Sequence, residues 1–191
     1  MLFGRNYLTQ LEKVSDQAIK EIASSIADAI AALHKLLHQA TSHLQVPTAQ
    51  ENLEMLAKET AGLRNSDWYV IQLREKLKAL RTEATPIIHG DCNISNLLFA
   101  GNTVCAAVDF AEVRRGFYEE DLAAIIAELP HYKSALIAAF ESYSGCSVNE
   151  SQLNYGLALN AFISYAISSR AGNELLSAVC RESLEKFLKT C

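Results

Sequence analysis

Two short apolar runs, separated by a turn-forming segment, place a tight hairpin near the middle of this 191-residue chain. Leu97–Phe99 and Val104–Val108 are apolar or β-branched, and Ala100–Thr103 lie between them. This pattern is typical of two antiparallel strands joined by a turn. Because antiparallel strands bring their outer ends together, Asn96 before the first strand is expected beside Asp109 after the second.

The rest of the chain has the periodicity of helices. Apolar residues recur every three or four positions from Ile19 to Leu37, with Ser15 as the expected N-cap. A second helix opens at a capping box of Thr48 and Glu51 and is broken at Gly62. Further helices are expected over residues 67–81, 122–129, 132–143, 153–167 and 175–188, with Asn149 and Gln152 as another capping box. The sequence therefore predicts a mainly α-helical fold with one small β-hairpin.

Composition narrows the class of protein. Half of the residues are apolar, which is enough to fill the core of a single domain over residues 1–191. The net charge of −5 argues against a nucleic-acid partner, and no apolar run approaches the roughly 18 residues of a membrane span. Five scattered cysteines without a C-x-x-C motif indicate reduced thiols and a cytoplasmic location. Cys92 lies among polar residues, but no signature around it favours a nucleophile.

Four polar residues around the hairpin have an informative spacing. His89 and Asp91 come first, Asn96 follows four residues after Asp91, and Asp109 precedes Phe110. Protein kinases use H-R-D-x-x-x-x-N followed by an Asp-Phe pair, because a carboxylate accepts the hydroxyl proton while amide and carboxylate oxygens suit magnesium. Taken singly, the two aspartates would be better explained as turn or capping residues. Their joint spacing favours catalysis, whereas His89 is expected to be a structural core histidine.

The wider pattern resembles the aminoglycoside phosphotransferase and choline kinase superfamily of small-molecule kinases. That superfamily has H-G-D-x-x-x-x-N, a short hairpin, an Asp followed by Phe or Trp, a Gly, and D-L-A opening a helix. The matching segments here are His89–Asp91, Asn96–Phe99, Val108–Phe110, Gly116 and Asp121–Ala123, with Ile26–Leu36 resembling the L-A-x-L-H helix of the superfamily. The catalytic and metal loops would then lie within residues 87–116.

This resemblance implies the carboxy-terminal lobe of a protein-kinase-like fold. It implies a phosphotransferase that uses ATP and Mg²⁺ and acts on a small-molecule hydroxyl. Asp91 would be the catalytic base, and Asn96 and Asp109 would bind Mg²⁺ and with it the nucleotide. His89 and Asp121 would give structural support. The motifs do not distinguish an aminoglycoside, choline or homoserine as substrate.

Other polar residues near the motifs are interpreted more simply. Asp121 is expected to cap the helix that follows and to brace the catalytic loop. His34 and His38 lie four residues apart on a helix, but without a third ligand a packing or surface role is favoured over a metal pair. A solvated charged loop is expected for Glu112, Arg114, Arg115, Glu119 and Glu120.

The amino-terminal β lobe of such kinases is expected to be absent. No two of the eight glycines are closer than eleven residues, so G-x-G-x-x-G does not occur. Leu2–Leu8 resembles the segment that links the two lobes, so the chain is expected to begin where that lobe ends. A separate amino-terminal lobe or a second copy of the chain is therefore an expected partner, besides the small-molecule substrate. The alternative is a non-catalytic module, derived from a kinase lobe, that binds a small molecule or another protein.

Overall fold

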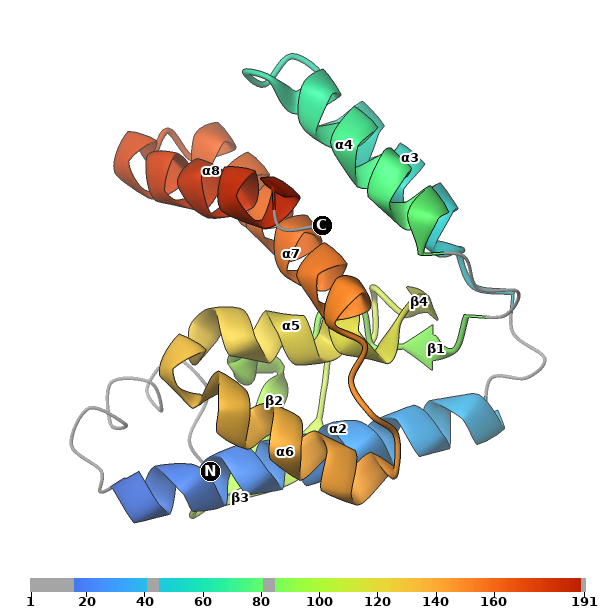
Figure 1. The fold of residues 1–191 in the computed structure, drawn as a ribbon, viewed down its shortest axis with the longest axis vertical. Helices are drawn as coiled ribbons and strands as arrows, with labels where there is room; N and C mark the ends of the chain where they lie inside the picture. Colours follow the sequence, from blue (N-terminus) through green and yellow to red (C-terminus); the bar gives the residue numbers. More distant parts are fainter. Residues whose placement is uncertain (1–15, 41–44, 81–84, 190–191) are drawn as a thin grey trace.

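Helix α7 (Glu150–Arg170) runs through the middle of the structure and takes part in two hydrophobic cores (Figure 1). Its residue Leu157 lies in the first core, whereas Phe162 lies in the second. The predicted mainly α-helical fold with a small hairpin is confirmed. The computed structural model describes residues 16–40, 45–80 and 85–189.

The first core lies between α2 (Asp16–Ala40), α5 (Tyr118–Glu128) and α6 (Lys133–Ser144), which follows the short 3₁₀ turn η2 (Pro130–Tyr132). The predicted apolar stripe of α2 is the face that becomes buried, as expected for an amphipathic helix. Its buried members include Ile19, Ile22, Ile26 and Ile30. The expected N-cap of this helix, Ser15, lies outside the described residues.

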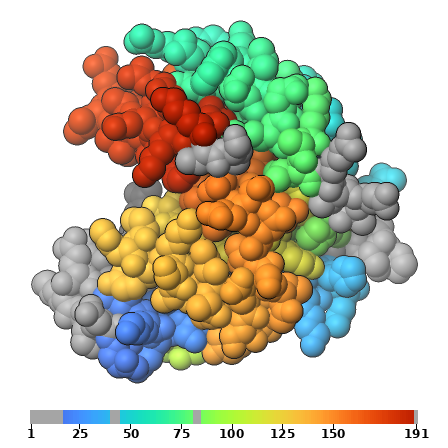
Figure 2. All heavy atoms as spheres, viewed as in Figure 1, coloured from blue at the N-terminus to red at the C-terminus, as the bar shows by residue number. Residues whose placement is uncertain are grey.

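The second core joins α7 to the hairpin of α3 (Ala49–Glu59) and α4 (Ser66–Ala79) and to α8 (Glu174–Lys189). In Figure 2, the atoms of α3, α4 and α8 occupy one end of the molecule, while α5 and α6 occupy the other. The predicted capping box of α3 is confirmed. The Thr48 hydroxyl oxygen accepts from the amide of Glu51 at 3.1 Å, and the Glu51 carboxylate accepts from the amide of Thr48 at 2.8 Å.

The predicted hairpin is also confirmed. β2 (Leu97–Ala100) pairs with β3 (Thr103–Ala107) in an antiparallel ladder that sets Leu97 opposite Ala107. Gly101 begins the turn with φ +61°, a left-handed conformation that glycine adopts at little cost. The 3₁₀ turn η1 (Ile94–Asn96) leads directly into β2, so the polar loop before the hairpin is compact rather than extended.

A second, two-stranded sheet was not expected from the sequence. β1 (Ile87–Ile88) pairs with β4 (Arg114–Arg115), with Ile87 opposite Arg115. The amide of Gly116 continues the contact by donating to the carbonyl of Pro86 at 3.0 Å. Two-residue strands are too short to show periodicity, yet this pair brings the start of the catalytic loop beside the end of the metal loop.

Two helix starts differ from the prediction. α5 begins at Tyr118 rather than at residue 122, because the Glu120 carboxylate accepts from the amide of Phe117 at 2.7 Å and closes the first turn. At α7, the Asn149 side chain caps two amides, but the reciprocal bond of the predicted box is missing. The Asn149 amide instead donates to Glu119 at 2.8 Å, which ties α7 to α5. None of the described helices is long and apolar enough to cross a membrane.

Candidate active site

The carboxylate of Asp91 is held by two side-chain amides. Asn93 donates to Oδ1 and Asn96 donates to Oδ2, both at 2.9 Å. The Asn96 amide nitrogen also donates to the carbonyl of Asp91 at 2.9 Å, which closes the loop on itself. Each carboxylate oxygen can accept more than one hydrogen bond, so this arrangement orients Asp91 and leaves it able to accept a further hydrogen bond. Asn93 is thus part of the support of Asp91.

Asp109 lies two residues beyond Ala107, where the hairpin ladder ends. The amide of Val108 donates to the carbonyl of Asn96 at 2.9 Å, so the strand pairing extends past β3 and brings Asn96 next to the residue before Asp109. Asp109 has φ +62°, a left-handed conformation that is uncommon for a residue with a Cβ. Such strained positions concentrate at functional sites. The predicted proximity of Asn96 and Asp109 therefore follows from the backbone pairing.

His89 connects the loop that contains Asp91 to the end of the hairpin at Val108. Its Nδ1 accepts from the amide of Asp91 at 3.3 Å, and its Nε2 lies 2.9 Å from the carbonyl oxygen of Val108. A carbonyl only accepts, so these two contacts fix the tautomer with the proton on Nε2. The buried ring also lies 4.8 Å from the ring of Phe110, which is 45% exposed. This arrangement supports the structural role expected for His89.

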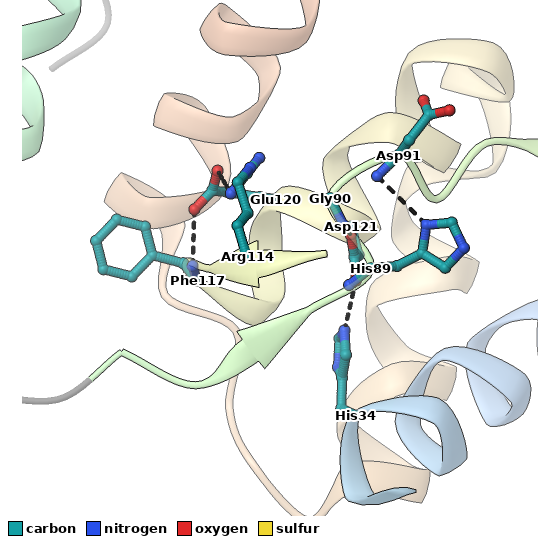
Figure 3. A network of polar contacts seen from close by, with 8 residues as sticks. All are labelled: His34, His89, Gly90, Asp91, Arg114, Phe117, Glu120 and Asp121. Atoms are coloured by element: carbon teal, nitrogen blue, oxygen red, sulfur yellow. Dashed lines mark hydrogen bonds and ion pairs between the residues drawn. The ribbon is translucent and has the colours of Figure 1, made fainter. Parts of the chain in front are cut away.

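Asp121 braces the catalytic loop from α5 (Figure 3). Its Oδ1 accepts from the amide of Gly90 at 2.9 Å, and its Oδ2 accepts from the amide of His89 at 2.9 Å. Oδ2 also accepts from Nε2 of His34 at 2.8 Å. The expectation that Asp121 caps the helix is wrong, because Asp121 lies inside α5 and Glu120 makes the capping bond.

His34 is a supporting residue that the sequence interpretation underestimated. It is buried between Asp121 and the ring of Tyr118, which stacks on it at 4.4 Å, whereas His38 is exposed. The two histidines therefore do not form a metal pair. Burial raises the pKa of Asp121, but the hydrogen bonds from His34 and from the two loop amides outweigh it and leave the pKa below its ordinary value. The signal for His34 was its place in the L-A-x-L-H helix.

Gly90 is required by the packing of the two loops. It has φ +83°, and a Cβ on it would lie 2.1 Å from the carbonyl oxygen of Glu112. No side chain fits there, which explains why glycine stands between His89 and Asp91. The neighbouring Cys92 is buried, and burial raises the pKa of its thiol well above the ordinary value, so the structure gives it no nucleophilic character.

The prediction of a solvated charged loop is wrong for three of its residues. Arg114, Glu119 and Glu120 are buried, and Nη1 of Arg114 forms an ion pair with Oε2 of Glu120 at 2.9 Å. Burial lowers the pKa of Arg114, but the charges of Glu120 and Asp121 outweigh it and raise the pKa. Figure 3 shows Arg114 and Glu120 on the side of Asp121 opposite to His89 and Asp91. The pair holds β4 against α5 and so fixes the end of the metal loop.

A cavity of about 290 Å³ opens beside Asp91, between α3 and α7. It is lined by Asn52, Met55, Leu56, Glu59, Thr60, Gly90, Asp91, Glu112, Arg114, Ile163, Ala166, Ile167 and Arg170. A larger hollow of about 960 Å³ lies along α5, α7 and α8, but none of the predicted site residues borders it. The smaller cavity is therefore the candidate acceptor site, because it contains the carboxylate.

A family model described as the phosphotransferase enzyme family matches residues 2–150. The chain belongs to this phosphotransferase family. No curated protein matches the chain.

Solved structures share the fold of this phosphotransferase chain. The amicoumacin kinase hAmiN, in complex with AMP-PNP, Ca²⁺ and Ami, is 14% identical, with a TM-score of 0.71 over 90% of this chain and 60% of that one. Aminoglycoside phosphotransferase APH(3'')-Id from Streptomyces rimosus, in complex with ADP and streptomycin, is 16% identical, with a TM-score of 0.60 over 76% and 63%. A macrolide 2'-phosphotransferase type I is 20% identical, with a TM-score of 0.56 over 85% and 58%. The chain thus spans about 60% of the length of these proteins.

The side chains around the hairpin fit the divalent cation that the resemblance implies. The side-chain amide nitrogen of Asn96 donates to Asp91, so the side-chain oxygen of Asn96 remains to coordinate a metal ion, and Asp109 adds a carboxylate. The described residues contain no cluster of three or more His, Cys, Asp and Glu side chains that would hold a metal alone. One amide oxygen and one carboxylate suit Mg²⁺, which keeps several waters and takes further oxygens from phosphates.

Proposed function

We propose that this chain carries the acceptor half of a phosphotransferase that uses ATP and Mg²⁺ and acts on a small-molecule hydroxyl. The observation that carries the proposal is that Asn96 hydrogen-bonds both to Asp91 and to the residue before Asp109. Its side chain donates to the carboxylate of Asp91 at 2.9 Å, and its carbonyl accepts from the amide before Asp109 at 2.9 Å. A base and two oxygen ligands thus share one backbone frame, as phosphoryl transfer requires.

In this proposal Asp91 accepts the proton of the attacking hydroxyl. The amides of Asn93 and Asn96 keep its carboxylate oriented, and the adjoining cavity places the acceptor against it. Asn96 and Asp109 would hold Mg²⁺, which when bound neutralises charge on the nucleotide phosphates. His89 and Asp121 position the loop without touching the acceptor.

Two related structures support the proposed reactants. One is a complex with ADP and streptomycin, and the other is a complex with AMP-PNP, Ca²⁺ and Ami. The chain matches about 60% of such proteins, so we propose that a separate nucleotide-binding lobe or a second copy of the chain completes the cleft. A non-catalytic binding module is the alternative, because the same cavity would accept a ligand without phosphoryl transfer.

Substitution of Asp91 by asparagine tests the proposal. We expect Asp91→Asn to lower ADP release from ATP and Mg²⁺ by at least roughly 100-fold, the scale of general-base catalysis. The full chain would be assayed with a panel of acceptors that includes streptomycin, kanamycin, erythromycin and choline. Asp67→Asn on the exposed start of α4 is the matched control and should retain the full rate. An unchanged rate for Asp91→Asn would refute the assignment, and acceptor binding without transfer, even when a nucleotide-binding lobe is supplied, would favour the binding module.

A further inference from the structure

The cavity beside Asp91 has apolar walls on both sides. Met55 and Leu56 from α3 and Ile163, Ala166 and Ile167 from α7 line it. Met55 is 44% exposed and Ile167 is 64% exposed, although both belong to residue types that normally avoid water. Apolar side chains left exposed in a concave site that also contains a functional carboxylate indicate a ligand with apolar surface of its own.

Three acidic residues line the cavity, and one of them, Asp91, is assigned to the hydroxyl of the acceptor. Glu59 and Glu112 are exposed at its edge, and Arg170, also exposed, makes no ion pair among the described residues. Arg114 adds no free charge, because Glu120 neutralises it inside the protein. Two glutamates therefore remain for the amino groups of a ligand, and Arg170 repels a ligand that has many of them. A ligand with one amino group finds a partner in either glutamate.

The volume of about 290 Å³ lies at the low end of ligand sites, which are typically about 300–1,000 Å³. Such a cavity holds one ring-sized part of a larger molecule. The part seated against Asp91 must carry the hydroxyl, while the apolar remainder extends along the side chains of α3 and α7.

We infer that the acceptor is an amphiphilic alcohol with an apolar body and a single amino group at most, rather than a polycationic aminoglycoside. The inference rests on the proposed function because it takes Asp91 to mark the hydroxyl end of the ligand. The apolar walls supply most of the contact area, and Glu59 or Glu112 pairs with the amine.

Calorimetric titration of the full chain without nucleotide tests this inference with two probes. Erythromycin combines one amino group with a large apolar ring, and kanamycin has several amino groups and no apolar body. We expect erythromycin to bind at least roughly tenfold more tightly, a difference of about 1.4 kcal/mol. Its affinity should change little between low salt and 0.5 M salt, roughly the range over which screening removes surface attraction. Tighter, salt-sensitive binding of kanamycin would overturn the inference.

Two pairs of variants assign the binding to this cavity. Ile167→Asp should weaken erythromycin binding at least roughly tenfold, whereas Leu175→Asp, at an 80% exposed position on α8, should not change it. Arg170→Glu should strengthen kanamycin binding, whereas Arg181→Glu on α8, outside the cavity, should not. Equal effects of Ile167→Asp and Leu175→Asp, or no saturable erythromycin binding, would overturn the inference. Because nucleotide is omitted, a failure of phosphoryl transfer would reject the proposed function alone.

Discussion

At the scale of single residues, the Asp121 carboxylate does most to shape the site. One buried side chain accepts from His34 and from the amides of His89 and Gly90, so it connects α2, α5 and the catalytic loop. A buried carboxylate without donors would be strongly unfavourable, and these three donors make the ionised form the stable one. The geometry around Asp91 therefore depends on a group that does not border the acceptor cavity.

Asp121→Asn should reveal this dependence as a pH-dependent loss of stability. We expect the free energy of unfolding to fall by about 3 kcal/mol at pH 7, as for other broken buried pairs. The pKa of Asp121 is below 3.8, its ordinary value, so its stabilisation is present above that pH and is lost as the pH falls through the folded-state pKa. The difference between variant and native chain, measured by urea unfolding, should shrink below pH 3.8. A difference that stays constant, or one equally large in the exposed Asp67→Asn control, would contradict this.

The sequence anticipated residues that belong to a local motif and missed those whose partners are distant. Asp91, Asn96 and Asp109 lie at either end of one hairpin, so their spacing alone predicted that they come together. His34 and Asp121 are separated by 87 positions, and periodicity contains no information on which buried polar groups meet. Glu120 was assigned to solvent for another reason, because the charged residues between Glu112 and Glu120 resemble an exposed loop and their burial follows only from the fold.

At the scale of elements, α7 approaches α5 closely because Gly156 has no side chain. A Cβ there would lie 2.9 Å from the Cβ of Ala123 and 2.9 Å from the Cα of Glu120. The backbones of α5 and α7 therefore lie directly against each other, and α5 is the helix that carries Asp121. The helices and the hairpin were predictable because each spans several periods of its pattern, whereas the two-residue pairing of β1 and β4 has no such signal.

The sign of the stability change caused by Gly156→Ala shows whether close packing or helix propensity dominates at this position. Propensity alone predicts a gain of about 1 kcal/mol. Overpacking against backbone costs about 1–3 kcal/mol, and we expect it to prevail and lower the melting temperature. Asn154→Ala is the matched control, because Asn154 borders the large hollow and its replacement should not lower stability. A higher melting temperature for Gly156→Ala would contradict the close approach.

At the scale of the whole molecule, the two cores have different relations to the site. Cys92, Ile94, Leu97 and Phe99 anchor the loops in the first core, whereas Leu53 and Leu56 of α3 belong to the second. Val108 and Phe110 beside the metal loop remain 37% and 45% exposed. The nucleotide side of the proposed site is thus an open surface, whereas the acceptor side is a formed cavity.

Calorimetry of the full chain with ATP and Mg²⁺ measures how tightly this open surface binds the nucleotide by itself. The 191 residues contain no G-x-G-x-x-G loop, so the nucleotide would be held mainly through the metal ligands. We expect a dissociation constant of about 1 mM, which corresponds to a binding free energy of roughly −4.1 kcal/mol. We expect no binding by Asp109→Ala. Asp109→Gly should also fail, although glycine tolerates the φ of +62°, so that strain is excluded as the cause. Native-like binding by Asp109→Gly would refute the role of the carboxylate.

The division of the site between the two cores has an evolutionary consequence. His34 and Asp121 hold the predicted catalytic loop from α2 and α5, whereas Met55 and Leu56 of α3 line the proposed acceptor cavity. Under the proposed function, we expect mutations of exposed α3 residues such as Met55 to alter which molecule is bound and to leave the reacting groups undisturbed. A lineage with this architecture can exchange one acceptor for another through a few surface substitutions in a single helix, without passing through variants in which the chemistry is lost.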